Sequence, residues 1–380
     1  MIYLDNALAT RADDRVVREI EKYLVEYYGL PTSEVGHSMG VHLLQSLEEA
    51  RKTVADAIGA EENEVIFTSG STESDNIAIK GPSLRSKKKK TLLVSEIGRK
   101  CQKNSAYYMK RHHGFEVGII RPTPDGFIDI DDLSEKINED TFLVSIMHAN
   151  HEIGSLNDLK QISSIVHDYD AFLHVDATYS FLANKINVKD LGIDLLTIDA
   201  SPIYGPKGAA ALYISRNVPI ESPISGAPNE FGRRPGDPNM PAIMGFKKAI
   251  EIWDNNDVTR IKKMRDRLIK GLLELKNASL NGPTGDKRNY NNVNISFRRV
   301  EGEAITLWLD KKGIIVNTGS ACFSPVLEPS SIILAMGKTH EDANGSVRFT
   351  IGKYNTIEEI DYTIEAVHEI IKKLLELSPI

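Results

Sequence analysis

The chain has 380 residues, a length that exceeds one ordinary domain and predicts one large domain plus one small domain. Its composition, with 41% hydrophobic and 26% charged residues, is that of a globular protein with an ample core. The formal net charge of −7 argues against a nucleic-acid-binding or membrane-binding surface, and no run of about eighteen apolar residues occurs.

The cysteine content and the first residues indicate the cellular compartment. Only two cysteines occur, Cys101 and Cys322, which excludes a disulfide framework or a four-cysteine metal site within one chain. The sequence opens on Ile2-Tyr-Leu-Asp5, which predicts a strand rather than a signal peptide. We therefore expect a cytoplasmic protein.

Helical and extended patterns alternate through the first two thirds of the chain. Apolar residues at helical spacing predict helices over 13–28, 42–59, 100–111, 131–137 and 159–169. Short apolar runs predict strands over 64–68, 91–95, 116–120, 142–147, 172–175, 195–198 and 209–214. Residues 31–40 are polar and glycine-bearing, which predicts a loop. The alternation predicts a mostly parallel sheet with helices on both faces.

The last third has a different order of elements. A polar loop is expected over 219–241, and a long helix over 242–273 that breaks near Asn255-Asn256. The following patterns predict strands at 292–297, 314–316 and 346–350, and helices at 302–312, 330–336 and 356–377. This block predicts a second, α+β domain made of residues 1–12 and 256–380, beside a large α/β domain of residues 13–255.

A glycine turn joins the strand at 64–68 to the helix that follows it. Its sequence, Ser69-Gly-Ser-Thr-Glu-Ser74, places backbone N–H groups and the Thr72 hydroxyl at a helix N-terminus. Such an end binds anions because its first N–H groups are unpaired and the helix dipole favours negative charge. The alternative is that these hydroxyl residues only cap the helix.

Two strands of the predicted sheet end in carboxylates, and this points to a ligand crevice. Asp176 follows the strand at 172–175, and Asp199 follows the strand at 195–198. A helix cap or a loop residue is the alternative role for Asp176.

Cys322 lies among small residues in Thr318-Gly-Ser-Ala-Cys322, in a loop after a predicted strand. A single cysteine is usually a small buried hydrophobic residue, so this segment alone leaves its role open. Cys101 falls within a predicted helix without any motif, and we expect it to be structural.

Taken together, these segments resemble the cysteine desulfurases, a branch of the pyridoxal-phosphate (PLP) enzymes of aminotransferase class V. The resemblance rests on Ile203-Tyr-Gly-Pro-Lys-Gly208, Gly319-Ser-Ala-Cys322 and Ser346-Val-Arg-Phe-Thr-Ile-Gly352, and it extends from Tyr3 to Pro379. It implies the class V aminotransferase fold: an α/β large domain around a mixed, mostly parallel seven-stranded sheet, plus a small α+β domain. It also implies a homodimer.

The resemblance assigns roles to individual residues. Ser71 and Thr72 stand in the turn that holds the PLP phosphate, and Asp176 is the partner of the pyridinium nitrogen. Arg348 and Asn150 stand at substrate-binding positions. Cys322 stands at the thiolate that attacks the substrate sulfur and becomes a persulfide.

Several cofactor-binding positions depart from the family pattern. Pro202 replaces the lysine that forms the Schiff base, and proline cannot form an imine. Asp199 and Ser201 replace a serine and a histidine that hold the phosphate, and Asp237 replaces a threonine that reaches the partner subunit's phosphate. Two like charges about 4 Å apart repel by roughly 4 kcal/mol at an effective dielectric constant of about 20. These aspartates are therefore expected to oppose phosphate binding unless they are protonated or neutralised by Arg233 or Arg234.

Three further positions depart in the same direction. Arg99 falls near the position of the histidine that stacks on the cofactor ring, Tyr179 replaces a glutamine and His151 replaces an asparagine. We therefore expect Ser71, Thr72, Asp176, Asp199, Ser201, Pro202 and Asp237 to form a vestigial cofactor site.

The sequence thus leads to one hypothesis and two alternatives. The hypothesis is a desulfurase-like protein that has lost PLP catalysis and acts in iron–sulfur cluster assembly or sulfur transfer. Cys322 would be its persulfide carrier, or a ligand of an iron–sulfur cluster, toward a scaffold or sulfur-acceptor protein. The first alternative is an active PLP-dependent cysteine desulfurase, which converts L-cysteine to L-alanine and a cysteine persulfide. The second is a purely structural dimer partner, in which Cys322 is dispensable.

Overall fold

The larger part of the molecule is built on one seven-stranded sheet. The computed structural model describes residues 1–33, 35–319 and 329–377. The strands are β2 (Val65–Thr68), β3 (Thr91–Ser95), β4 (Glu116–Ile120), β5 (Thr141–Met147), β6 (Phe172–Asp176), β7 (Leu195–Asp199) and β8 (Ala210–Ile214). They are arranged in the order β2-β8-β7-β6-β5-β3-β4, and only β8 is antiparallel to its neighbours among these described strands. The predicted mixed, mostly parallel sheet is confirmed.

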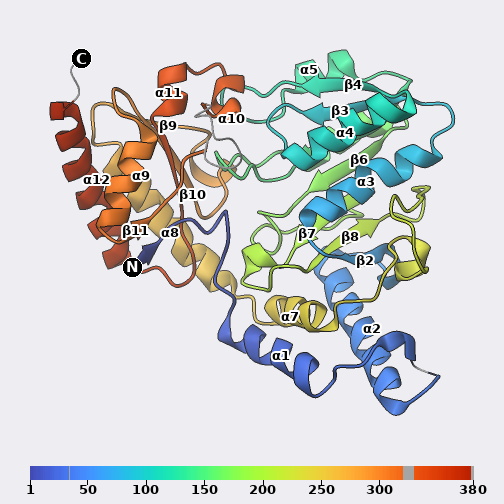
Figure 1. Ribbon diagram of the computed structural model, residues 1–380. Helices are drawn as coiled ribbons and strands as arrows, with labels where there is room; N and C mark the ends of the chain where they lie inside the picture. Colours follow the sequence, from blue (N-terminus) through green and yellow to red (C-terminus); the bar gives the residue numbers. More distant parts are fainter. Residues whose placement is uncertain (34, 320–328, 378–380) are drawn as a thin grey trace.

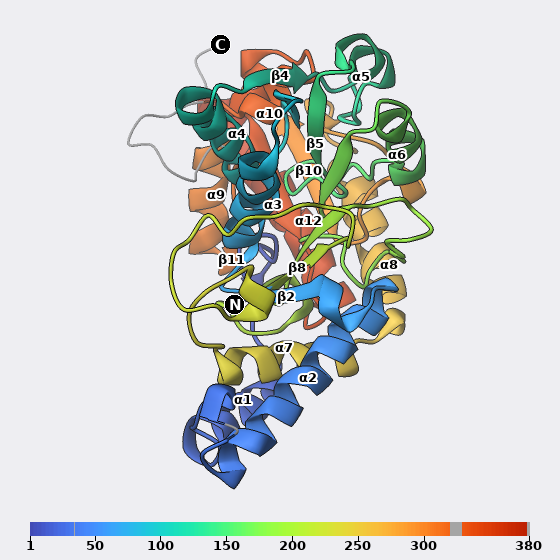
Figure 2. The same ribbon diagram turned by 90° about the vertical axis from the view of Figure 1, so that its right-hand side faces the viewer.

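Helices cover both faces of this sheet, as the alternating pattern predicted (Figure 1). One face is covered by α3 (Ser71–Arg85) and α4 (Lys100–His113), whose apolar side chains form one core cluster with the strands. The other face is covered by α2 (Ser38–Ile58), α5 (Ile130–Lys136), α6 (Leu159–Asp168) and α7 (Met240–Glu251). Helix α1 (Asp14–Val25) packs on α7, and together α1 and α2 project from one end of the molecule (Figure 2).

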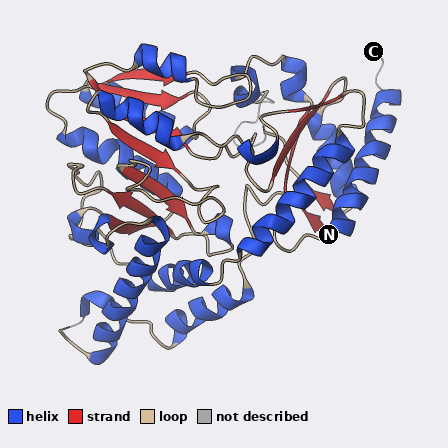
Figure 3. Ribbon diagram, turned by 180° about the vertical axis from the view of Figure 1, so that it is seen from behind, coloured by secondary structure: helices blue, strands red, loops and turns tan. Residues whose placement is uncertain are grey.

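The rest of the chain forms a smaller α+β part around a second core. Its strands are β1 (Ile2–Tyr3), β9 (Ala278–Leu280), β10 (Asn292–Phe297), β11 (Ile314–Ile315) and β12 (Ser346–Thr350). Its helices are α8 (Asn255–Leu272), α9 (Gly302–Lys311), α10 (Ser331–Ala335), α11 (His340–Asn344) and α12 (Ile357–Leu377). Seen from behind, long helices lie across its strands (Figure 3). Leu4 belongs to this core, although it lies far from the other members in sequence. The division at residues 12/13 and 255/256 stays a proposal.

Several element boundaries differ from the predictions. The loop expected over 31–40 contains a short 3₁₀ turn at Pro31–Ser33, and α2 begins at Ser38 because the His37 ring nitrogen accepts the Gly40 N–H at 3.0 Å. Histidine is not among the preferred N-cap residues, so its capping role was not evident from the sequence. The predicted break near Asn255 is confirmed, since α7 ends at Glu251 and Asp254 caps α8.

Two short elements, β9 and α11, were not predicted because they are too short to show a helical or strand periodicity of apolar residues.

No helix within the described ranges has both the length and the apolar character needed to cross a membrane.

A buried ion pair attaches the long polar loop before α7 to the sheet. The Arg51 guanidinium lies 2.7 Å from the Glu230 carboxylate, and both side chains are only 3% exposed. Glu230 also accepts the Phe67 N–H at 2.8 Å, and Arg51 donates to the Val65 carbonyl at 2.8 Å. A short polar network therefore fixes the loop against β2.

Replacing Glu230 by glutamine should lower the free energy of unfolding by about 3–5 kcal/mol, because the buried Arg51 charge loses its counter-ion. The matched control is Glu116→Gln, which removes an exposed partner of Lys110 and should cost about 0–1 kcal/mol. Urea unfolding of both variants measures the difference. Equal losses would show that the buried pair does not stabilise the loop.

Candidate functional site

The carboxyl ends of β6 and β7 meet the N-terminus of α3 at a small cavity. Its volume is about 200 Å³. It is lined by Asn6, Ala7, Leu8, Ala9, Ser71, Arg99, Thr178, Tyr179, Asp199, Ser201, Pro202, Lys207 and Gly208. The predicted positions 71, 199, 201 and 202 thus come together. The N-terminal segment 6–9 also forms part of the wall, and no sequence pattern indicated this.

Asp199 lies against the N-terminus of α3. Its Oδ2 accepts the Ser71 N–H at 2.9 Å, and its Oδ1 accepts the Ser201 N–H at 2.9 Å. Asp199 is 9% exposed and Ser71 is 5% exposed. The predicted anion site is therefore occupied by a carboxylate of the chain itself, and neither Arg233 nor Arg234 is its partner.

Asp176 is fully buried at the end of β6 and has a cation beside it. The Arg99 Nη1 lies 3.2 Å from the Asp176 Oδ2, while the Thr178 N–H donates to Oδ1 at 2.9 Å. Arg99 comes directly before α4, and its side chain is 19% exposed at the wall of the cavity. The structure thus places Arg99 at the side of the carboxylate that the resemblance assigns to a ring nitrogen.

The two predicted substrate-binding residues have internal partners. Arg348 Nη2 lies 2.9 Å from a carboxylate oxygen of Asp5, and both side chains are nearly buried. The Asn150 side chain donates to the Ile97 carbonyl at 3.0 Å and accepts backbone N–H groups of its own turn. Neither residue lines the cavity.

Other predicted residues lie away from the cavity. Thr72 is exposed in the first turn of α3, and Asp237 is exposed in the loop before α7. Arg233 donates to the Asn63 carbonyl at 2.9 Å, and Arg234 pairs with Glu73 at 2.9 Å. These arginines therefore do not supply the neutralisation that would remove the expected repulsion between the aspartates and a phosphate. Cys322 lies outside the described residues.

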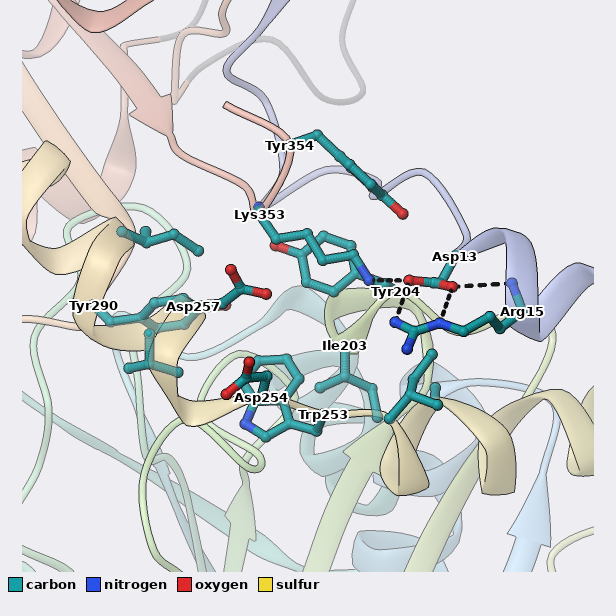
Figure 4. A pocket seen from close by; sticks show the side chains of 14 residues that line it. Asp13, Arg15, Ile203, Tyr204, Trp253, Asp254, Asp257, Tyr290, Lys353 and Tyr354 are labelled. Carbon is teal, nitrogen blue, oxygen red and sulfur yellow. Dashed lines mark hydrogen bonds and ion pairs between the residues drawn. The ribbon is translucent and has the colours of Figure 1, made fainter. Parts of the chain in front are cut away.

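A larger cavity of about 340 Å³ lies between the two parts of the molecule (Figure 4). There the Lys353 amine forms an ion pair with Asp13 at 2.5 Å and lies 4.3 Å from the centre of the Tyr204 ring. Arg15 holds the same carboxylate at 2.9 Å. The loop after β12 is thereby fastened to the start of α1.

The described residues do not include a metal centre. In residues 1–33, 35–319 and 329–377, no group of three or more histidines, cysteines, aspartates or glutamates could hold a metal ion. The hypothesis of a cluster ligand thus concerns Cys322 alone.

The comparison with known families decides the family. The family model described as aminotransferase class-V matches residues 2–363. The chain belongs to the class V aminotransferases. A protein named cysteine desulfurase IscS 1, from Archaeoglobus fulgidus, is 41% identical over 385 aligned positions that cover 100% of this chain and 99% of the relative. A cysteine desulfurase IscS from Dictyoglomus turgidum is 40% identical, covering 100% and 96%.

Solved structures support the same family. A NifS-like protein superposes with a TM-score of 0.90 at 32% identity, covering 98% of this chain and 99% of that one. A NifS-like protein from Rickettsia africae gives a TM-score of 0.86 at 30% identity, covering 98% and 99%. The predicted fold and the resemblance to the cysteine desulfurases, a PLP-dependent group, are confirmed.

In this class V member, a neutral histidine lies beside the cleft. The rings of His151 and Tyr179 stack with centroids 5.8 Å apart, and the His151 Nδ1 is buried without a partner among the described atoms. Burial first, and then the Arg348 charge, lower the pKa of His151 to about 3. His151 therefore stays neutral in the folded protein at pH 5, whereas in the unfolded chain it is protonated below about pH 6.5.

The depressed pKa of His151 predicts an acid-dependent loss of stability. A group whose pKa is lower in the folded protein contributes its full stabilisation above the pKa that it has in the unfolded chain, which is about 6.5 for histidine. This stabilisation is lost as the pH falls toward the folded pKa of about 3. His151→Asn should reduce the fall in unfolding free energy between pH 7 and pH 5 by about 2 kcal/mol. The control is His113→Asn at an exposed position, which should leave the pH dependence unchanged. Urea unfolding at both pH values measures this, and parallel curves for the His151→Asn variant and the unchanged protein would contradict it.

Proposed function

We propose that this class V member has lost PLP catalysis and acts in iron–sulfur cluster assembly or sulfur transfer through Cys322. The proposal rests on which residues occupy the cleft. Pro202 stands at the position of the Schiff-base lysine, and the Asp199 carboxylate accepts the N–H groups of Ser71 and Ser201.

The residues present do not fit covalently bound PLP. Proline offers no amine, and Asp199 places a negative charge where the phosphate group would lie. Arg99 places a positive charge beside Asp176, where the pyridinium would lie. Lys207 lines the cavity, but the family has a lysine at this position in addition to the Schiff-base lysine. It is therefore a poor substitute.

Cys322 supplies the chemistry that the proposal needs. A thiolate attacks the terminal sulfur of a donor persulfide, the donor S–S bond breaks, the donor leaves as a thiolate, and the sulfur remains on Cys322. The acceptor protein then takes this sulfur by the same exchange. The same thiolate is also suited to binding an iron–sulfur cluster with a scaffold protein. Support comes from the Gly319-Ser-Ala-Cys322 motif and from the names of the relatives.

The second candidate function is an active PLP-dependent cysteine desulfurase. A specific observation favours it: relatives named cysteine desulfurase match the whole chain at 40–41% identity. This function requires a lysine other than position 202 to hold the cofactor, and Lys207 is the lysine that lines the cleft.

We propose in addition that the chain forms a homodimer in the cytoplasm. Large exposed apolar side chains gather on the projecting α1–α2 region, and they comprise Val17, Leu24, Val25, Tyr28, Leu30, Val35 and Val41. Concentrated exposed apolar side chains mark contact surfaces, and a second copy of the chain is the occupant that the family resemblance supports. The loop over residues 225–237 would then lie against the partner's cleft.

The purified protein, incubated with PLP, should lack the visible absorbance of a lysine-bound cofactor and should release no sulfide from L-cysteine. The reason is the absence of an amine at Pro202 together with the charge of Asp199. The protein should nevertheless accept sulfur from a donor persulfide, and Cys322→Ser should abolish this, whereas Cys101→Ser should retain it. A borohydride-reducible PLP adduct on Lys207, together with sulfide release, would favour the active desulfurase.

The dimer proposal predicts that the protein sediments as a dimer at micromolar concentration. Charging the projecting region with Tyr28→Glu and Val41→Glu should yield monomers, because two desolvated charges would oppose the contact. The exposed pair Tyr362→Glu and Leu377→Glu, on α12, is the control and should remain dimeric. A monomeric unchanged protein would refute the proposal.

A further inference from the structure

Two charged side chains that depart from the family pattern line the same cleft. Asp199 lies at the N-terminus of α3, and Arg99 lies beside Asp176. The sign of each charge matches the part of PLP that the family binds at that place. The phosphate is negative, as Asp199 is, and the pyridinium is positive, as Arg99 is. If the two substitutions were unrelated, their positions and the signs of their charges would not both be expected to match those of the phosphate and the pyridinium.

The N-terminus of α3 requires a hydrogen-bond acceptor. Its first N–H groups have no partner within the helix, and the helix dipole adds partial positive charge. Ser71 is 5% exposed, so water has little access to its N–H group. The Asp199 carboxylate accepts this N–H and that of Ser201 at 2.9 Å, in charge-assisted hydrogen bonds that a bound phosphate would otherwise receive.

Asp176 requires a cation because an unpaired buried carboxylate is costly. It is 0% exposed, as is its neighbour Asp75. Burial first, and then the Asp176 charge, raise the pKa of Asp75 well above its usual value. Arg99, whose Nη1 lies 3.2 Å from the Asp176 Oδ2, is the counter-ion of this buried carboxylate.

We propose that Asp199 and Arg99 are internal counter-ions that replace the phosphate and the pyridinium of the cofactor, so that the large domain is stable with an empty cleft. This inference rests on the proposed loss of PLP catalysis and deepens it. The cleft is charge-balanced by the chain itself. Restoring the family's residues one at a time should therefore destabilise the protein instead of repairing it.

Thermal unfolding of the full-length protein in a buffer without phosphate tests the inference. Asp199→Ser and Arg99→His introduce the residues that the family has, and each should lower the Tm by about 5 °C or more, since about 1 kcal/mol corresponds to about 2–4 °C in domains of this size. The controls make the same exchanges at exposed positions. They are Asp190→Ser and, on α4, Arg111→His, and they should shift the Tm by less than about 1 °C.

Inorganic phosphate provides a second readout. At constant ionic strength set with chloride, phosphate should not raise the Tm of the unchanged protein, because Asp199 already holds the site. It should raise the Tm of Asp199→Ser by about 2 °C or more, because the vacated N–H groups can bind an oxyanion. Neither control variant should respond.

The outcomes separate this inference from the proposed function. Equal Tm values for Asp199→Ser and Asp190→Ser, or for Arg99→His and Arg111→His, overturn the counter-ion inference even in a protein without desulfurase activity. A phosphate-induced rise in the unchanged protein as large as that in Asp199→Ser also overturns it. Sulfide release from L-cysteine overturns the proposed function whatever the Tm values are.

Discussion

The need to neutralise buried charge governs the centre of this molecule. Three of the buried carboxylates at or near the cleft, with exposures of 0 to 9%, each have a partner of opposite charge or polarity. Asp5 is paired with Arg348, Asp176 with Arg99, and Asp199 with the N-terminus of α3. Any one of them without its partner would cost several kcal/mol, which is comparable with the net stability of a domain.

These pairs also determine how the parts of the chain are joined. Asp5 and Asp13 lie at the two ends of the N-terminal segment. Asp5 is paired with Arg348 of β12, and Asp13 is paired with Lys353 of the loop after β12. The segment is thereby fastened to the small part at both ends, and its residues 6–9 become a wall of the cleft. A segment that belongs to no regular element thus contributes to the site because two ion pairs hold it there.

The polar residues of the cleft can be substituted while the fold persists, because the cleft and the fold depend on different residues. The fold rests on apolar clusters on the two faces of the sheet and in the smaller part. The cleft depends on a few polar side chains at strand and helix ends. Changing their charge alters what the cleft binds without removing apolar contacts.

The sequence by itself determined the family, the seven-stranded sheet and several of the positions that line the cleft, such as Asp199 and Pro202, because periodicity, strand ends and motifs are local features. It also predicted that Pro202 and Asp199 depart from the family pattern. Only the tertiary structure decided that Asp199 binds the N-terminus of α3, that Arg99 pairs with Asp176, and that Asn150 and Arg348 are held by internal partners. These partners lie far apart in sequence, for example 77 residues for Arg99 and Asp176 and 128 for Ser71 and Asp199. Their meeting depends on the packing of whole elements, which no local pattern encodes.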